Sequence, residues 1–457
     1  MKINSIRIMK NILFSGAVVA LTAGLASASG FALIEQSVSG LGNAYAGGAA
    51  IAEDASTVFF NPAGMTRLPG TQCIAGANLI APSARFRNEG STHVLQQVTG
   101  APLAGNNGGD GGETAVTPNL YLTRRINDRL TLGLGISAPF GLATDYNDTW
   151  VGRYYALRSE LKTVNLNPSI AYRLNEHLSI GAGLSAEYIK AKLSNAIDFG
   201  TLDAVGFFAP LGLTRGQLRL VPQMADGFAS MEGDDWSAGF NLGLLYEKDK
   251  DTRVGVSYRS RIKHTLTGTV DFSNVPAGLA ATPLFKNGGI SADITLPDVL
   301  SVSMAHRITP AWTVMGDVTW THWSLFNELR VRFDNPYQPD SVTTTDWRDS
   351  FRYSAGVAYA PGNNWTWRLG IAYDQTPVRN AQTRTPRIPD GDRIWTALGL
   401  GYKASDRVSF DAGYAHLFVN DPAIAKTPTG EDASRGGLTG SYSAHVNIVS
   451  AQATIRF

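Results

Sequence analysis

The stretch NWTWRLGIAYD, residues 364–374, decides the fold of this chain, because its side chains alternate in character at every position. Large apolar side chains occupy every second place: Trp365, Trp367, Leu369, Ile371 and Tyr373. Small or polar side chains lie between them: Asn364, Thr366, Arg368, Gly370, Ala372 and Asp374. A β-strand directs successive side chains to opposite faces. This period of two therefore predicts a strand with one apolar and one polar face.

The same alternation recurs along the chain, for example in LSIGAGLSAEY (178–188) and VSFDAGYAHLF (408–418). There are about fourteen such runs, and the last of them, AQATIRF, ends the chain. The joins between runs alternate between tight turns such as NDR, NEH and PGN and long segments such as 196–234 and 273–289. An even strand number with short turns on one rim and long loops on the other is typical of outer-membrane barrels.

A soluble β-sandwich also has strands with one apolar and one polar face, so the alternation alone fits both architectures. Aromatic residues near strand ends, among them Trp312, Trp320 and Tyr402, favour the barrel, where aromatic girdles mark the membrane interfaces. The predicted fold class is all-β: a transmembrane antiparallel β-barrel of about 14 strands, plugged by a small N-terminal hatch with short helices.

The start of the chain predicts export from the cytoplasm. Lys2, Arg7 and Lys10 precede the apolar run ILFSGAVVALTAGL, and ASA at 26–28 is a small-residue cleavage site. This three-part pattern is that of a signal peptide, here residues 1–28. The net charge of +1 implies no nucleic-acid partner, and the single cysteine, Cys73, excludes an intrachain disulfide.

Catalytic and cofactor motifs are absent from the sequence. It contains no G-x-S-x-G, H-E-x-x-H, Walker or C-x-x-C pattern, and its seven histidines are scattered. We therefore expect no enzyme activity, no cofactor and no metal. A membrane-embedded hydrolase remains an alternative, because catalytic triads are recognised by geometry and not by sequence order.

Two long joins are unusually apolar. The segments 196–234 and 273–289 carry six large apolar residues that we take as ligand-loading candidates: Phe207, Phe208, Leu211, Leu213, Leu284 and Phe285. Exposed loops rarely carry so many unless they bury or bind something. Packing of the two loops on each other and a landing site for an apolar ligand are both open, and they are compatible.

Residues 29–70 do not alternate. Asn61 and Pro62 in the stretch DASTVFFNPAGM fit the N-cap and first position of a helical turn. A barrel of this size has an open lumen if it is left empty, so a compact segment ahead of the first strand is suited to plug it. We expect Glu35, Glu53 and Asp54 to meet arginines of the lumen. The predicted division is signal peptide 1–28, hatch 29–70 and barrel 71–457.

The stretch GFALIEQSVSGLGNAYAGGAAIAEDASTVFFNPAGM (30–65) resembles the N-terminal hatch of the FadL/TodX family of outer-membrane hydrophobic-compound transporters. The run GLGNAYAG (40–47) and the triplet Asn61, Pro62 and Ala63 carry the likeness, together with IPDGDR (388–393). The resemblance extends over essentially the whole chain after the signal peptide.

The resemblance implies a monomeric barrel in the bacterial outer membrane, in contact with its lipid. It also implies passive uptake of long-chain fatty acids or aromatic hydrocarbons. The ligand is expected to land on the long loops, to move to an inner pocket, and to leave sideways into the bilayer where the third strand kinks. That kink maps to Pro139, Phe140 and Gly141. Pro139 agrees physically, because proline has no N–H for the strand ladder.

The sequence departs from the family at the inner pocket. Fatty-acid members grip the ligand carboxylate with basic residues, and here those positions fall on Asn195 and Thr343. Lys190, Lys192 and Arg348 are close in sequence and are the candidate carboxylate-binding residues. Long-chain fatty acids are the first expectation, and a channel for uncharged aromatic hydrocarbons is the alternative. A surface adhesin and a polar-solute porin are further alternatives, although a hatch argues against the porin.

Overall fold

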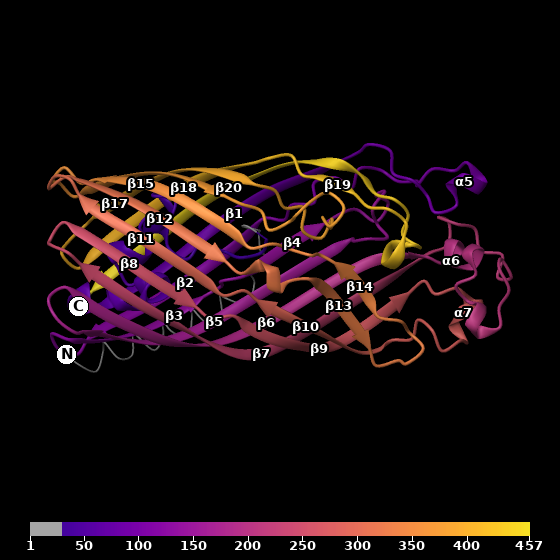
Figure 1. Cartoon of the computed structure of the whole chain (residues 1–457), viewed down its shortest axis with the longest axis horizontal. Helices are drawn as coiled ribbons and strands as arrows, with labels where there is room; N and C mark the ends of the chain where they lie inside the picture. Colours follow the sequence, from indigo (N-terminus) through magenta and orange to yellow (C-terminus); the bar gives the residue numbers. More distant parts are fainter. Residues whose placement is uncertain (1–29) are drawn as a thin grey trace.

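The alternating segments are β-strands in the computed structural model, which describes residues 30–457. The predicted signal peptide, residues 1–28, lies outside the described residues. Fourteen antiparallel spans close into a barrel (Figure 1), so the predicted fold class is confirmed. Among residues 30–457, no helix has both the length and the apolarity needed to cross a membrane.

Eight spans are continuous strands: β1 (Thr71–Asn88), β2 (Ala115–Arg125), β5 (Arg158–Arg173), β6 (Leu178–Asp198), β7 (Asp226–Glu247), β16 (Trp365–Asp374), β17 (Arg393–Lys403) and β20 (Thr439–Arg456). Six spans are interrupted and consist of two strands each: β3 (Leu130–Ser137) with β4 (Gly141–Asp145), β8 (Thr252–Arg259) with β9 (Ile262–Ser273), β10 (Gly288–Leu296) with β11 (Val299–Arg307), β12 (Trp312–Thr321) with β13 (Glu328–Phe333), β14 (Ser341–Thr344) with β15 (Ser350–Tyr359), and β18 (Val408–Val419) with β19 (Ala423–Ala425).

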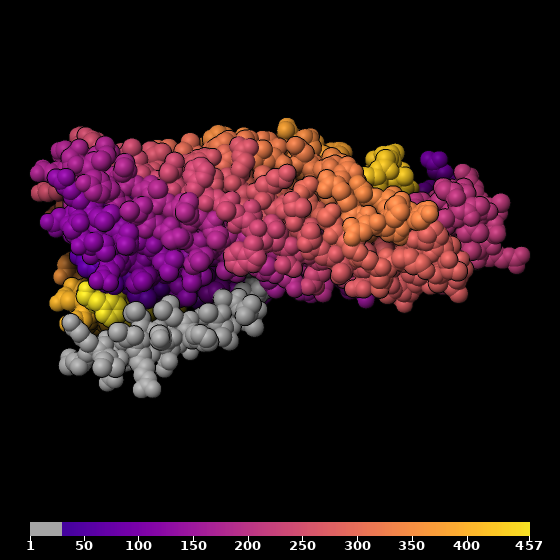
Figure 2. Space-filling model, turned by 90° about the horizontal axis from the view of Figure 1, so that it is seen from below, coloured from indigo at the N-terminus to yellow at the C-terminus, as the bar shows by residue number. Residues whose placement is uncertain are grey.

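The first and last strands close the barrel. β1 pairs with β2 on one side and with β20 on the other, where the ladder runs from Gln72↔Arg456 to Asn88↔Gly440. The tight turns gather at the end where the chain finishes, and the long joins project beyond the opposite end (Figures 1 and 2). The long joins carry the short helices α5 (Gln96–Thr99), α6 (Phe199–Val205), α7 (Ala277–Ala280), η3 (Ala209–Leu211) and η5 (Gly430–Asp432). Long loops are the extracellular ones in outer-membrane barrels.

The polarity of the wall is the reverse of a soluble protein. On β16 the outward side chains Trp367, Leu369 and Ile371 are exposed, whereas the inward Arg368 is buried. The same holds for β11, where Leu300, Val302 and Met304 are exposed. The outer face is therefore apolar and the inner face polar, as acyl chains outside and a filled lumen inside require.

The hatch, residues 30–70, fills the lumen near the end with the short turns (Figure 1). Its elements are α2 (Val38–Leu41), α3 (Gly48–Ile51), α4 (Thr57–Phe60) and η2 (Pro62–Arg67). Asn61 caps η2 as predicted, because its side-chain oxygen accepts a 3.0 Å hydrogen bond from the N–H of Ala63. The Asn61 side chain also donates to the carbonyl oxygens of Ala49 (2.6 Å) and of Leu244 in β7 (3.0 Å), which joins hatch and wall.

Inward-facing glycines of the wall make room for the hatch. A Cβ on Gly243 would lie 2.0 Å from Oδ1 of Asn61, and a Cβ on Gly181 would lie 2.3 Å from the nitrogen of Ala63. The triplet Asn61, Pro62 and Ala63 therefore rests directly on the backbone of β6 and β7. Among the acidic residues of the hatch, the pairing predicted for Glu53 is confirmed by its 3.1 Å contact with Arg368.

The other two hatch acids behave differently from the prediction. Asp54 accepts hydrogen bonds from the hydroxyl of Ser39 (2.7 Å) and the amide of Gln452 (3.1 Å), so neutral donors satisfy it in place of an arginine. Glu35 is buried near Arg352 and Arg393, and burial dominates its environment, raising its pKa to about 7.

Candidate functional site

An apolar inner pocket lies in the barrel between the hatch and the extracellular loops. It contains about 750 Å³ of unfilled space, counted together with the solvent open to it. Its walls are mostly inward side chains of β4 to β7, β9, β10 and β13: Leu142, Leu161, Ala191, Leu193, Met231, Leu266, Ile290, Ala292, Ile294 and Val331. Phe31 of the hatch and Phe326 close one side of it.

Arg387 belongs to this largely apolar lining, which also includes Ser159, Glu160 and Glu232. Arg387, in the segment between β16 and β17, is 6% exposed. It donates to the hydroxyl of Ser159 at 3.0 Å and to the side-chain oxygen of Asn195 at 3.4 Å, and also reaches the backbone carbonyl oxygens of residues 158 and 194 at 3.3 Å. All four acceptors are neutral, and no carboxylate of residues 30–457 forms an ion pair with Arg387.

Arg387 is a buried cation whose hydrogen-bond partners are all neutral. Burial, and to a smaller extent the nearby charge of Arg435, lower the pKa of the Arg387 guanidinium to about 9. Buried charges in proteins are normally paired, and leaving one unpaired is costly. A ligand with a negatively charged head group would supply the absent partner.

The three lysine and arginine candidates from the sequence lie elsewhere. Lys190 and Lys192 project from the outer face of β6 and pair with Glu232 of β7, at 2.5 and 3.7 Å. Arg348 is exposed, in the segment before β15. None of the three lines the inner pocket, so the structure does not bring them to the carboxylate site proposed for them. Asn195 does reach it, as an acceptor for Arg387.

An aromatic cluster separates the inner pocket from a second cavity on the side of the hatch, which we call the lower cavity. The cluster comprises Phe31, Phe140, Trp323, Phe326 and Trp347. Its rings are in edge contact, with centroids 4.7 Å apart for Phe31 and Trp323 and 4.8 Å apart for Phe326 and Trp347. Phe31 and Phe326 face the inner pocket, whereas Phe140 and Trp323 face the lower cavity.

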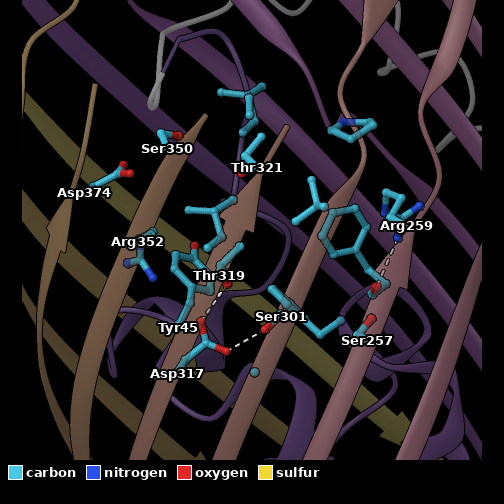
Figure 3. A pocket seen from close by; sticks show the side chains of 18 of the residues that line it. Tyr45, Ser257, Arg259, Ser301, Asp317, Thr319, Thr321, Ser350, Arg352 and Asp374 are labelled. Atoms are coloured by element: carbon cyan, nitrogen blue, oxygen red, sulfur yellow. Dashed lines mark hydrogen bonds between the residues drawn. The ribbon is translucent and has the colours of Figure 1, made fainter. Parts of the chain in front are cut away.

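The lower cavity has about 970 Å³ of unfilled space and two unlike walls. Side chains from β8, β11, β12 and β15 form a polar wall (Figure 3), in which Asp317 accepts hydrogen bonds from Ser301 (2.6 Å) and Thr319 (2.7 Å). The hatch supplies the facing apolar wall, including Phe59 and Phe60. Two wall arginines tie the hatch down, since Arg259 donates to the carbonyl oxygen of Phe59 and Arg352 to that of Ala44.

The third span breaks at the position expected for the kink. β3 ends with the pair Ser137↔Asn165 and β4 starts with Gly141↔Lys162, so three residues (138–140) face two on β5. Within the described chain β4 pairs with β5 but not with β2, whose ladder with β3 stops at Leu120↔Ile136. The β2 ladder is therefore not continued along β4 beside Pro139 and Phe140, which both line the lower cavity. Hatch residues 31–33 pair with residues 139–141 there, and the segment before β2 meets β4 again at Gly112↔Thr144.

The two apolar loops pack on each other, as one of the two sequence interpretations predicts. Phe208, Leu284 and Phe285 are buried in a common cluster in which the rings of Phe199 and Phe285 lie 4.9 Å apart. Leu211 and Leu213 are partly buried at its margin, and Phe207 is 36% exposed. The loops that carry these residues project beyond the barrel at the extracellular end (Figure 2). Their role in ligand loading stays a prediction.

Sequence reasoning missed Arg387 and the two tryptophans of the aromatic cluster. Arg387 directly precedes the IPDGDR motif, but its loop position gives no period from which its direction could be inferred. Trp323 lies in the interruption between β12 and β13, where the alternation fails and the local 3₁₀ turn η4 (Trp323–Leu325) points it inward. The failing alternation was the available signal.

Comparison with known proteins places this geometry in a family. The profile of the outer membrane protein transport protein family (OMPP1/FadL/TodX) matches residues 19–457. A long-chain fatty acid transport protein of Escherichia coli O6:H1 is 36% identical over 87% of this chain and 89% of its own length.

Two solved structures share the fold. That of a Pseudomonas aeruginosa FadL homologue superposes with a TM-score of 0.83 at 26% identity, covering 94% of this chain and 100% of the other. The Ralstonia pickettii toluene transporter superposes with a TM-score of 0.61 at 21% identity, covering 92% of this chain and 100% of the other, and supports the fold alone. The chain thus belongs to the FadL/TodX family of transporters for hydrophobic compounds and is a protein of the bacterial outer membrane.

Proposed function

We propose that this protein is a passive transporter of long-chain fatty acids and acts as a monomer. In this proposal the ligand lands on the paired apolar loops and descends into the inner pocket with its carboxylate on Arg387. The hatch then shifts, and the ligand leaves through the interrupted wall beside Pro139, Phe140 and Gly141. No bond is made or broken, so no catalytic group is needed, and the concentration gradient sets the direction.

One observation carries the choice of a fatty acid: the buried, unpaired Arg387 in an apolar pocket. A carboxylate would neutralise it and form charge-assisted hydrogen bonds, which contribute more than neutral ones. An uncharged aromatic ligand would leave the guanidinium as costly as before. The relative named as a long-chain fatty acid transport protein supports the same choice.

The lateral route has a physical reason. A fatty acid that crossed a water-filled pore would keep its apolar surface wet, at about 25 cal/mol per Å². Handing the ligand from apolar loops to an apolar pocket, and from there to the bilayer, keeps that surface covered. The break between β2 and β4 and the adjacent lower cavity support an exit at this height.

The test compares palmitate with hexadecanol, which has the same chain but no charge. Binding to purified protein is measured for the wild type, Arg387→Met and Arg348→Met. We expect Arg387→Met to weaken palmitate binding by roughly tenfold to hundredfold, the loss of a charge-assisted contact, and to leave hexadecanol binding unchanged. Arg348→Met is the matched control, because that side chain is exposed and outside the pocket. Equal wild-type affinity for both compounds would overturn the choice of a fatty acid.

A further inference from the structure

The strand ladder of the wall also lapses between β10 and β13. The β10–β13 ladder holds only from Ile290↔Phe333 to Ala292↔Val331, and regular pairing resumes at Val299↔Thr321 between β11 and β12. Between these points, residues 293–298 on one strand face residues 322–330 on the other, six against nine. The longer side cannot follow the ladder, so it leaves the wall.

The surplus residues turn into the barrel. They form η4, which directs Trp323 and Phe326 into the aromatic cluster. The turn is held by the neighbouring interruption, since the carbonyl oxygen of Phe326 accepts a 2.7 Å hydrogen bond from the hydroxyl of Thr345. Side chains, and not a strand ladder, therefore fill the wall between residues 293–298 and 322–330.

A groove lies on the outside of the barrel at the same place. Its rim is charged and its floor is apolar: Lys263, Asp293, Glu328, Arg330 and Arg332 surround Leu325. Two buried residues, Ile294 and Phe326, line both this outer groove and the inner pocket. Ile294 and Phe326 therefore lie between the inner pocket and the outer groove.

The charges around the groove locate it relative to the membrane. Its rim carries the ion pairs Arg332–Asp293 (3.0 Å) and Arg330–Glu328 (2.6 Å), which suit a polar surrounding. Next to the groove, on the side of the short turns, the outward side chain of Leu300 in β11 belongs to the apolar outer face of the barrel. The groove thus lies where acyl chains give way to head groups on the extracellular side.

The charged residue Arg387 lies at the side of the inner pocket opposite this groove. Arg387 binds β5 and β6, whereas Ile294 and Phe326 belong to β10 and the segment before β13. β7 and β9 lie between these two pairs of strands in the sheet. A ligand whose carboxylate is at Arg387 therefore directs its tail across the pocket toward Ile294 and Phe326.

We infer that the wall between β10 and β13 is a second lateral opening, which admits the tail end of a long-chain carboxylate from the inner pocket into the outer groove. Ile294 and Phe326 are the closing residues and determine the ligand length at which the tail emerges. This inference rests on the proposed function, because it needs the carboxylate held at Arg387. Phe31 of the hatch packs on Phe326 at 5.5 Å, so hatch movement removes one support of this closure.

The first experiment places a cysteine in the groove floor, Leu325→Cys, in a Cys73→Ala background so that it is the only thiol. Its modification by a water-soluble maleimide is followed with octanoate, decanoate, palmitate or stearate bound. We expect stearate to slow modification about tenfold at concentrations that fill nine-tenths of the sites, and octanoate to have no effect. Thr269→Cys, at an exposed position of β9 outside the groove, is the matched control and should show no dependence on chain length.

A second variant removes the closure. Phe326→Ala is expected to raise the affinity for a palmitate with a bulky terminal group about tenfold, with octanoate unchanged, because the end of the pocket is then open. Phe60→Ala, which removes an aromatic ring from the lower cavity, should leave both affinities as they are. One outcome refutes the opening and leaves the proposed function standing: all carboxylates bind, none of them slows modification of Leu325→Cys, and Phe326→Ala shows no increase in affinity. If no carboxylate binds at all, both are refuted.

Discussion

The N–H of Gly141 donates a 2.8 Å hydrogen bond to the carbonyl oxygen of Phe31, so the hatch pairs with β4 as a neighbouring strand would. A second bond of the same length runs from the N–H of Leu33 to the carbonyl oxygen of Pro139. The backbone groups that β4 would otherwise share with a neighbouring strand are thus taken by hatch residues 31–33. A ligand exit at this place therefore requires the hatch to release residues 139–141.

Gln36 stabilises this pairing between the hatch and β4. Its buried side chain donates to the carbonyl oxygens of Ala138 (2.7 Å) and Leu33 (3.0 Å). Gln36→Ala leaves both without this donor, which costs about 1–3 kcal/mol. We expect amide exchange at Leu33 and Gly141 to accelerate roughly fivefold to hundredfold, while the barrel melts at the same temperature. Gln382→Ala, in an exposed loop, is the control, and equal exchange in both variants would contradict the prediction.

The register at the break allows the exit to be closed by one deletion. Residues 138–140 face two residues of β5, so removing Pro139 eliminates both the surplus residue and the missing N–H. We expect palmitate binding to the inner pocket to persist and uptake by whole cells to fall to background. Uptake at the wild-type rate in a folded variant would exclude this exit.

Period-two alternation predicted the strands and the inward or outward direction of most wall residues, and together with the turn pattern and the aromatic positions it predicted the barrel. Applied strictly, it also argues against two of the basic candidates. Lys190 and Lys192 continue the outward series of Leu184 and Tyr188 on β6, and the structure places both on the outer face.

What could not be predicted lies where the ladder is interrupted. Trp323, Phe326 and Arg387 come from turns and loops, whose directions depend on long-range packing and not on period. The glycines that receive the hatch were visible as small residues on the polar face. Their partners were not, because contacts such as Gly243 with Asn61 join positions far apart in the sequence.

Gly243 is a sensitive test of hatch docking. Alanine there would place Cβ 2.0 Å from Oδ1 of Asn61, so the triplet that rests on β6 and β7 must move. Overpacking of this kind costs about 1–3 kcal/mol. We expect limited proteolysis to cut the hatch faster in Gly243→Ala, in a barrel that still folds. Gly316→Ala is the matched control, because the nearest atom to its Cβ would be 3.8 Å away. Identical cleavage of both would contradict the docking argument.

The two adjacent loop phenylalanines should behave differently. Phe208 is 1% exposed in the loop cluster, so Phe208→Ala is expected to cost about 3–5 kcal/mol of local stability and to release the loops to protease. Phe207 is 36% exposed, and Phe207→Asp should leave the loops folded but slow the loading of dilute palmitate. Stopped-flow binding measures the loading rate. A wild-type loading rate in Phe207→Asp would show that Phe207 only packs in the loop and does not take part in loading.

Glu35 predicts a dependence of the hatch on pH. Its buried carboxyl faces Arg352 of β15, Asp374 of β16, Arg393 of β17 and the Tyr45 ring of the hatch. Burial is the largest effect and raises its pKa from 4.5 to about 7, against the opposing influence of the two arginines.

The docked hatch therefore keeps a proton on Glu35 that an exposed glutamate would lose between pH 4.5 and about 7. The stability that this proton supports is complete below that window and is lost as pH rises through it, by roughly 3 kcal/mol at most. We expect hatch amides to open more often at pH 8 than at pH 5, after correction for the intrinsic rate of exchange. Glu35→Gln, which stays neutral, should remove the difference. A wild-type hatch that opens equally at both values would show that its docking does not depend on this proton.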